Sequence, residues 1–329
     1  MRILVVGAIQ GGTVPLGKSV ADGFSADNQS VDYLDYSDLF TEFNFIRQNP
    51  DAADRTANFF KLIKTRLLER IITFKPDIVF GISQAPLNDI EILSKIRQAG
   101  IMLCFWFTED YAVFDYWKSI APNFDFFFTI QQNPFWQELT KIGCNNYHYL
   151  PLAFDENQRK AGTAAPDIGV SFMGAPYPNR VFYLPQINGI RIYGEKWNEY
   201  QSSAVADGSR RVSDEEAHQI YLRTRININL HSSLNKSDFA NGDFVNPRTF
   251  AIAGMGAFQL TDMRRLLPLH FDLHQEIVAL ASFEDMQEAV KYFLKNEDER
   301  HLFVRRAQER VLDEHTYRLR MAEVLRIIS

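Results

Sequence analysis

The stretch best suited to ligand chemistry runs from Asn246 to Asp262 and reads NPRTFAIAGMGAFQLTD. Pro247 suits the first position of a helix, because its missing N–H would have no partner there, and Gly254 or Gly256 can take the positive φ of a helix C-cap. Arg248 therefore lies in the first turn, where free backbone N–H groups and the helix dipole favour an anion and a guanidinium matches phosphate. The pattern indicates a phosphate-binding helix. The alternative interpretation is that this stretch only connects a helix to a strand, and that Arg248 is solvated or paired with a carboxylate.

Two carboxylates at the end of the apolar run CFWFTED form a second candidate site. Glu109 and Asp110 would stand at the C-terminal end of a parallel strand, where ligands bind in open α/β sheets. Beside the aromatic residues of this run, either carboxyl group could bind a proton tightly enough to serve as a general base. Asp110 is the preferred base, because Glu109 could point to the opposite side of the strand end. A helix N-cap at Thr108 or Asp110 is the structural alternative.

A glycine-rich segment, GTVPLGKS from Gly12 to Ser19, matches the Walker A pattern letter for letter. In a P-loop the first glycine follows its strand directly, whereas here several residues intervene. A Walker B partner would be an apolar strand that ends in Asp, and the run Ile78 to Ile82 lacks that ending. We therefore expect Lys18 to make no phosphate contact and the loop glycines Gly11 and Gly12 to line a cleft. A P-loop phosphotransferase is the third functional hypothesis.

Motifs for metals and for dinucleotide cofactors are missing from the sequence. No G-x-G-x-x-G follows the first strand-like run, so a nicotinamide or flavin dinucleotide lacks its fingerprint. No two aspartates are separated by a single residue, so the D-x-D sequence by which many sugar-transferring enzymes hold a divalent cation is absent. His270 and His274 have no third ligand near them in the sequence. We expect no metal and no cofactor, and basic side chains with helix dipoles would have to stabilise any diphosphate leaving group.

The composition indicates a soluble protein of two domains. A chain of 329 residues is long for one hydrophobic core, and no apolar run approaches the roughly 18 to 20 residues that a membrane span needs. The N-terminal MRILVVGA enters a strand-like run without a signal-peptide pattern, and Cys104 and Cys144 fit reduced, buried thiols. These features predict a cytoplasmic protein without a disulfide. The net charge of −6 argues against a nucleic-acid partner.

Strand-like and helix-like segments alternate along the chain, and this alternation predicts parallel sheets covered on both faces. The periodicity is lost over 151–166, which we interpret as a linker, and it then restarts. The predicted organisation is a Rossmann-like domain at 1–155, a second at 166–310, and a C-terminal helix at 311–329 that is expected to cross back to the first. The expected strands lie at 3–6, 31–36, 78–82, 102–107, 124–130, 147–150, 170–173, 190–193, 226–230, 257–260 and near 277.

Several longer segments match a known family. They are VSFMGAPYPNR (170–180), RIYGEKW (191–197), ININLH (226–231), NPRTFAIAGMGAFQLTD (246–262) and RAQERVLDEHTYRLR (306–320). YLPLAFD is similar to that family's link between domains, and FWFTED to its acidic strand end in the first domain. With these segments the chain resembles the CgeB-type, glycosyltransferase-1-like proteins of the GT-B fold over most of residues 100–320.

The resemblance implies two Rossmann-like α/β domains that face a cleft, with the acceptor on the first domain and the nucleotide-diphospho-sugar mainly on the second. Arg180 and Arg248 would contact the diphosphate. Relatives usually carry glutamate at the position of Ala251, where it is expected to contact the donor ribose. Either another residue contacts the ribose here, or donor binding is weakened, or the chain has lost catalysis. The other implied donor-binding residues are Gly174, Gly194, His231, Asn246, Thr249 and Phe250.

The leading hypothesis is a metal-independent glycosyltransferase that moves a sugar from a nucleotide-diphospho-sugar to an acceptor, which is a glycan, a protein or a small molecule. The alternative is a non-catalytic protein that binds a nucleotide-sugar or acts as a scaffold, and Ala251 motivates it.

Overall fold

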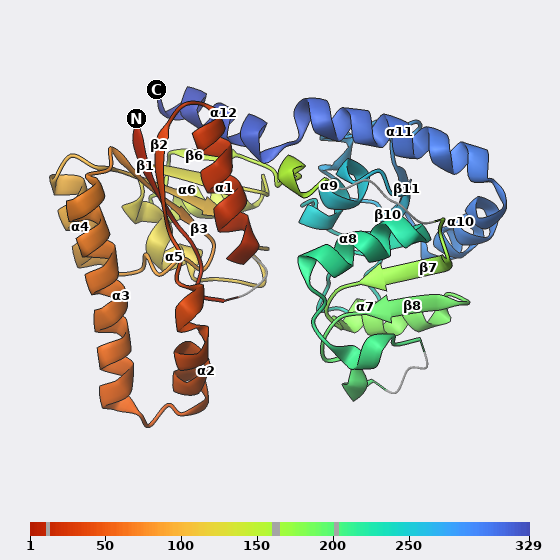
Figure 1. The fold of residues 1–329 in the computed structure, drawn as a ribbon, viewed down its shortest axis with the longest axis horizontal. Coiled ribbons are helices and arrows are strands. Elements are labelled where there is room, and N and C mark those ends of the chain that lie inside the picture. The colour runs from red at the N-terminus through yellow and green to blue at the C-terminus, as the bar shows by residue number, and fades with distance from the viewer. Residues whose placement is uncertain (11–13, 160–164, 201–203) are drawn as a thin grey trace. The chain divides into compact units, whose positions relative to one another are not determined.

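The computed structural model describes residues 1–10, 14–159, 165–200 and 204–329, which form two α/β units (Figure 1). Met1–Pro151 and Tyr317–Ser329 make the first unit, and Leu152–Thr316 makes the second. Each unit has its own parallel sheet, so the predicted fold class is confirmed. The chain leaves the first unit at the start of the expected linker and returns to it for its last helix.

The first sheet has six strands in the order β2-β1-β3-β4-β5-β6, and all neighbouring strands are parallel. Its central strands β3 and β4 are buried along almost their whole length, as their apolar sequences IVFGI and MLCFWF require. The register pairs Ile82 with Trp106, so both strands end at the same edge. The strands are β1 (Arg2–Val6), β2 (Ser30–Leu34), β3 (Ile78–Ile82), β4 (Met102–Phe107), β5 (Phe126–Thr129) and β6 (Tyr147–Tyr149).

Amphipathic helices cover this sheet. In α3 the buried residues Phe59, Ile63 and Leu67 recur every four positions and therefore share one face. Helix α12 packs on α1 at Gly23, where an added Cβ would lie 2.8 Å from the carbonyl oxygen of Tyr317. The helices are α1 (Val14–Ala26), α2 (Phe40–Gln48), α3 (Ala53–Phe74), α4 (Ile90–Gln98), α5 (Trp117–Ile120), α6 (Phe135–Lys141) and α12 (Tyr317–Ile328).

The second sheet has five parallel strands in the order β11-β10-β9-β7-β8. Ser213 and Ser282 cap α8 and α10, since each hydroxyl accepts a backbone N–H from the residue three positions on. The strands are β7 (Ile168–Met173), β8 (Ile190–Tyr193), β9 (Thr224–Asn229), β10 (Gln259–Asp262) and β11 (Val278–Leu280). The helices are α7 (Pro178–Tyr183), α8 (Asp214–Arg223), α9 (Pro247–Gly254), α10 (Phe283–Lys295) and α11 (Glu297–Glu314).

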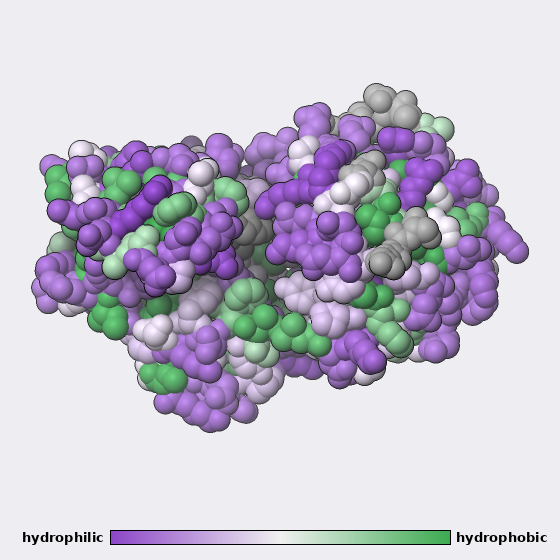
Figure 2. All heavy atoms as spheres, turned by 90° about the horizontal axis from the view of Figure 1, so that it is seen from below, coloured by the Kyte–Doolittle hydropathy of each residue, from purple (hydrophilic) through white to green (hydrophobic). Residues whose placement is uncertain are grey.

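Three features of the described residues bear on the predicted compartment: the hydropathy of the helices, the side chains on the surface and the two cysteines. None of the described helices combines the length and the apolar character needed to cross a bilayer. Figure 2 shows hydrophilic side chains over most of the face in view, with apolar side chains in separate patches. Cys104 and Cys144 are buried and free, and burial raises the pKa of both thiols, that of Cys144 to about 11.

Candidate functional site

Helix α9 begins at Pro247 because the residue before it is an N-cap. The Oδ1 atom of Asn246 accepts a hydrogen bond from the Thr249 N–H at 3.1 Å, and its backbone is extended. Pro247 has no N–H to satisfy and takes the first helical position, so Arg248 is the second. The helix start that the sequence predicts is therefore present, with Arg248 at the positive end of the helix dipole.

The guanidinium groups of Arg180 and Arg248 contact the same aromatic ring. The guanidinium carbon of Arg248 lies 5.0 Å from the ring centroid of Phe172, and that of Arg180 lies 5.2 Å from it. A Cβ atom on Gly174 would lie 2.5 Å from Arg248 Nη1 and 3.3 Å from Arg180 Nη1, so a glycine is needed here. The two cations are thus gathered where β7 ends.

Backbone carbonyl groups hold both guanidinium groups in place. Arg180 Nε donates to the carbonyl oxygen of Leu230 at 3.0 Å, and Arg248 Nη2 donates to the same oxygen at 3.2 Å. Arg248 Nη1 also donates to the carbonyl oxygen of Met173, and Arg180 Nη1 donates to that of Ala175 at 3.2 Å. A guanidinium has five N–H donors, so each arginine keeps donors for a further acceptor.

No described carboxylate forms an ion pair with either member of this arginine pair. Burial lowers the pKa of Arg180, and the neighbouring charge of Arg248 lowers it further. Burial also lowers the pKa of Arg248. Both shifts mean that positive charge is costly here, because burial disfavours the charged form, and the nearby Asp262 carboxylate offsets only part of that cost. An anion with several oxygen acceptors would offset that cost, and a diphosphate fits this description.

Two glycine loops border the arginine pair. Gly174 and Gly194 follow β7 and β8, and a Cβ on Gly194 would lie 2.5 Å from the carbonyl oxygen of Gly174. The same oxygen accepts a hydrogen bond from Trp197 Nε1 at 2.7 Å. The predicted donor-binding glycines therefore allow the two loops to approach each other beside Arg248.

His231 supports the start of α9 and does not face an open site. Its side chain is fully buried, Nδ1 donates to Asp262 Oδ1 at 2.8 Å, and Nε2 accepts the Asn246 N–H at 3.0 Å. Because Nε2 is an acceptor the ring is neutral, and burial lowers its pKa to about 4. Burial would raise the pKa of Asp262, but contacts with His231 and Arg264 outweigh it and hold that pKa at about 2. The prediction of His231 as a direct donor contact is corrected to a supporting role.

Thr249 and Phe250 are also part of the protein interior. Both are fully buried, and the hydroxyl of Thr249 accepts a hydrogen bond from Asn229 Nδ2 at 2.8 Å. The ring of Phe250 packs against Phe271 at 5.8 Å between centroids. Their side chains therefore fix α9 to the sheet, whereas sequence reasoning placed them on the donor. Ala251 is partly exposed in the turn of α9 that follows Arg248.

The candidate proton acceptors lie on the first unit, directly after β4. Glu109 is half-buried, and its carboxylate accepts hydrogen bonds from Gln84 Nε2 at 2.5 Å and from the Tyr116 hydroxyl at 2.6 Å. Burial raises the pKa of Glu109, and the hydrogen bonds from Tyr116 and Gln84 offset part of that rise. A half-exposed carboxylate with a raised pKa at a strand end has the properties of a general base.

Asp110 is used in a local turn. Its Oδ1 atom accepts the Ala112 N–H at 3.0 Å and Gln131 Nε2 at 3.3 Å, and its carbonyl oxygen accepts the N–H groups of Val113 and Phe114. The contacts form a local turn and not the helix N-cap named above as the alternative, since the next helix begins only at Trp117. The geometry therefore favours Glu109 over Asp110 as the proton acceptor, the reverse of the order given by the sequence.

The Walker-like segment does not form a phosphate loop in its described part. Gly17 and Lys18 lie inside α1, and Lys18 forms an exposed ion pair with Asp22 one turn later. A Cβ on Gly17 would lie 2.5 Å from the Tyr33 hydroxyl, so this glycine makes room for a ring on β2. The predicted cleft loop, Gly11 and Gly12, lies outside the described residues. The described residues contain no cluster of three or more His, Cys, Asp or Glu side chains that could hold a metal ion.

Five contributors to these sites were missed in the sequence analysis. Phe172 is part of the segment VSFMG, but nothing in its spacing indicates that it would lie under two arginines. Asp262 is the last residue of an ordinary strand pattern, and Arg264 comes two residues after it. Gln84 and Tyr116 lie 25 and 7 residues from Glu109, so their contacts with it cannot be read from local spacing. A positive φ at Gln84 is a signal visible only in the structure.

Comparisons with known proteins agree with the family named above. Residues 178–326 match the model of the glycosyl transferase-like family. The spore protein CgeB of Bacillus subtilis (strain 168) is 29% identical over 230 residues, which cover 63% of this chain and 69% of that protein. The resemblance to CgeB-type proteins is therefore confirmed.

Solved structures share the fold at low sequence identity. HepE of Anabaena, in complex with UDP and glucose, is 10% identical with a TM-score of 0.65, and the match covers 100% of this chain and 99% of that one. Sucrose-phosphate synthase of Thermosynechococcus elongatus is 9% identical with a TM-score of 0.64, with the same coverage of both chains. These likenesses confirm the GT-B fold.

Proposed function

We propose that this enzyme, a glycosyltransferase of the GT-B fold, moves a sugar from a nucleoside-diphosphate sugar to a hydroxyl group of an acceptor. The observation that carries the proposal is the arginine pair Arg180 and Arg248. Two guanidinium groups with spare N–H donors and no described carboxylate partner lie at the end of β7 and the start of α9. This arrangement suits a ligand with two adjacent phosphates.

The arginine pair would also assist the chemical step. When the bond between the sugar and the diphosphate breaks, the leaving oxygen gains negative charge, and fixed cations and a helix N-terminus stabilise it. Because these groups supply the positive charge, no divalent cation is required in this mechanism. The absence of D-x-D from the sequence is consistent with it.

The donor class is supported by the structural neighbours. HepE of Anabaena was solved in complexes with UDP-glucose and with UDP. We extend from that protein only the ligand class, a nucleoside diphosphate bearing a sugar.

On the first unit, Glu109 would accept the proton of the acceptor hydroxyl. Its pKa is raised by burial, which brings the carboxyl group closer to the pH at which it can take up and release a proton. The acceptor is a glycan, a protein or a small molecule.

A non-catalytic nucleotide-sugar-binding protein is the second candidate, and Ala251 is the observation that favours it. An alanine offers no carboxylate to the ribose at a partly exposed position of α9. Such a protein would bind nucleoside diphosphates through the arginine pair but release no nucleotide from a sugar donor.

A ligand screen tests the proposal. Thermal unfolding is followed with UDP, GDP, TDP and ATP, each with and without magnesium. Stabilisation by a nucleoside diphosphate that does not depend on magnesium supports the proposed site, because ligand binding to the folded state raises the unfolding temperature. Nucleotide released from the matching sugar donor then separates the enzyme from the binding protein. Stabilisation by ATP alone, and only with magnesium, would contradict the proposal.

A further inference from the structure

Gln84 holds an unusual backbone conformation beside Glu109. It lies two residues after β3 with φ at +65°, a region that side chains other than glycine seldom occupy. The Ala85 N–H donates to the Ile82 carbonyl oxygen at 2.7 Å and closes a tight turn around it. In this conformation the Gln84 amide reaches Glu109 Oε1. Such strain persists only where the surrounding structure enforces it, and it is frequent at functional sites.

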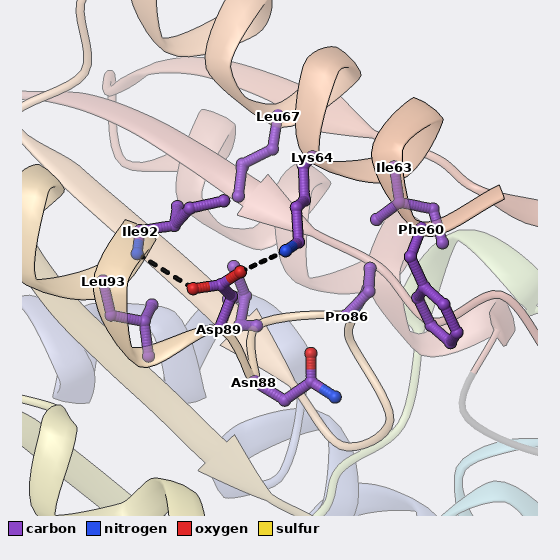
Figure 3. A pocket seen from close by; sticks show the side chains of 10 residues that line it. Phe60, Ile63, Lys64, Leu67, Pro86, Asn88, Asp89, Ile92 and Leu93 are labelled. Atoms are coloured by element: carbon purple, nitrogen blue, oxygen red, sulfur yellow. Dashed lines mark hydrogen bonds and ion pairs between the residues drawn. The ribbon is translucent and has the colours of Figure 1, made fainter. Parts of the chain in front are cut away.

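The loop that carries Gln84 is anchored at its far end. Figure 3 shows Asp89 between α3 and α4, joined to Lys64 by an ion pair and to the Ile92 N–H by a hydrogen bond of 3.2 Å. Leu87 is buried, and a Cβ on Gly81 would lie 2.5 Å from its side chain. The loop is therefore fixed on both sides of Gln84, which explains how the strained turn is maintained.

Tyr116 fixes the second oxygen of the same carboxylate. Its hydroxyl donates to Glu109 Oε2 at 2.6 Å and accepts the Gln84 N–H at 3.1 Å. Its ring packs edge-on against Phe107 at 5.4 Å between centroids. The Tyr116 hydroxyl therefore contacts both the Gln84 backbone and Glu109, and it also forms a hydrogen bond with Ser83.

The Glu109 carboxylate retains the capacity to take up a proton. Each oxygen accepts one of these hydrogen bonds, and a carboxylate oxygen has two lone pairs, so one on each oxygen is left. The group is half-exposed, whereas the hydroxyl of the preceding Thr108 is buried without a hydrogen-bond partner. A buried polar atom without a hydrogen-bond partner lowers stability, so its presence at this strand end is a second feature typical of a functional site.

We propose that Gln84 and Tyr116 are positioning residues that hold Glu109 as the proton acceptor of glycosyl transfer. This inference rests on the proposed function. The acceptor hydroxyl oxygen forms a bond to the sugar C1, the bond from C1 to the diphosphate oxygen breaks, and the nucleoside diphosphate leaves with that electron pair. The hydroxyl proton moves to a free lone pair of Glu109, so atoms and charge balance without a further reactant.

The first test replaces Gln84 by glycine. Gln84→Gly keeps the positive φ without strain and removes the side chain whose amide contacts Glu109. Lys75→Gly, which removes a side chain at another position with positive φ at the end of α3, is the matched control. We expect both variants to unfold within roughly 2 °C of the wild type. Turnover should fall about tenfold or more in Gln84→Gly alone, with nucleotide affinity unchanged. Equal turnover in both variants would overturn the role of Gln84.

The second test measures the protonation of Glu109. Tyr116→Phe removes a hydrogen bond that favours the carboxylate, so the midpoint of the Glu109 titration should rise by roughly one pH unit. The midpoint is read from ¹³C NMR of labelled glutamate carboxyl groups without substrate, and Glu109→Gln identifies the signal. The acid limb of turnover should move by the same amount. An unmoved midpoint would overturn the role of Tyr116.

The two proposals fail in different ways. If the wild type releases no nucleotide from any UDP-, GDP- or TDP-sugar, the proposed function is wrong, whatever the NMR titration shows. If the wild type is active but neither Gln84→Gly nor Tyr116→Phe changes turnover or its pH profile, the function stands and the positioning role is wrong.

Discussion

The Nε2 atom of His231 accepts a hydrogen bond from the backbone N–H of Asn246 at 3.0 Å. Asn246 in turn caps α9, whose second residue is Arg248. A neutral histidine two residues after β9 therefore helps to set where α9 begins and where the Arg248 guanidinium lies. The helix start depends on a buried hydrogen-bond network as well as on local sequence.

This relationship predicts a loss of stability in mild acid. The pKa of His231 is about 4 in the folded protein and about 6.5 when unfolded, so the unfolded chain binds the proton more readily. The free energy of unfolding should therefore fall as the pH drops from about 6.5 to 4, by about 3 kcal/mol at most. Hydrogen exchange of amides in β9, measured between pH 7 and pH 4.5, provides the readout. His231→Gln should flatten this dependence, and an unchanged slope would refute the assignment.

Arg248 should contribute directly to nucleotide binding. Arg248→Ala removes charge-assisted hydrogen bonds to the diphosphate and should weaken binding by about 1.5 to 3 kcal/mol. Calorimetry with the nucleoside diphosphate that stabilises the wild type gives the value. Arg305→Ala, which removes an exposed arginine of α11 in the same unit, is the control. Equal affinity in both variants would mean that the arginine pair does not bind the diphosphate.

Ala251 offers a gain-of-binding test. Ala251→Glu should place a carboxylate near the ribose and tighten nucleotide binding by about 1 kcal/mol or more, since hydrogen bonds to a charged group are stronger than neutral ones. Ala217→Glu, at a half-buried position of α8, controls for the added charge. Unchanged affinity in a folded Ala251→Glu variant would show that the position packs only against protein.

Glu109 and Asp110 should separate in their effects on turnover. Glu109→Gln should reduce turnover by about 10² to 10⁴ with donor affinity nearly unchanged, because the interaction is made only as the proton moves. Asp110→Asn should cost less, since Asp110 Oδ1 serves a turn. Because the folded pKa of Glu109 is raised, turnover should decline as the pH falls through it. The opposite ranking of the two variants would restore Asp110 as the base.

Lys18 should be dispensable for nucleotide binding. It lies within α1 and pairs with Asp22 in solvent. Lys18→Ala should keep the affinity for any nucleotide within about threefold, which is less than 1 kcal/mol. A hundredfold loss would instead support a phosphate loop at this segment.

The sequence by itself determined the local elements. Strands β3 and β4 follow from apolar runs. The caps at Asn246, Ser213 and Ser282 follow from side chains that act within three residues. The place of Arg248 in a first helical turn is local in the same sense. Such features depend on neighbours in the chain and need no knowledge of the fold.

Only the tertiary structure decided how these elements form sites. Arg180 meets Leu230 across 50 residues, and Arg248 meets Met173 across 75, so their pairing depends on strand order and register. The choice of proton acceptor between Glu109 and Asp110 depends on two contacts. Gln84, which is distant in sequence, donates to Glu109, whereas Asp110 accepts a hydrogen bond within a local turn. Residue types are encoded locally, but distance, burial and charge between residues far apart in sequence exist only after the sheet has assembled.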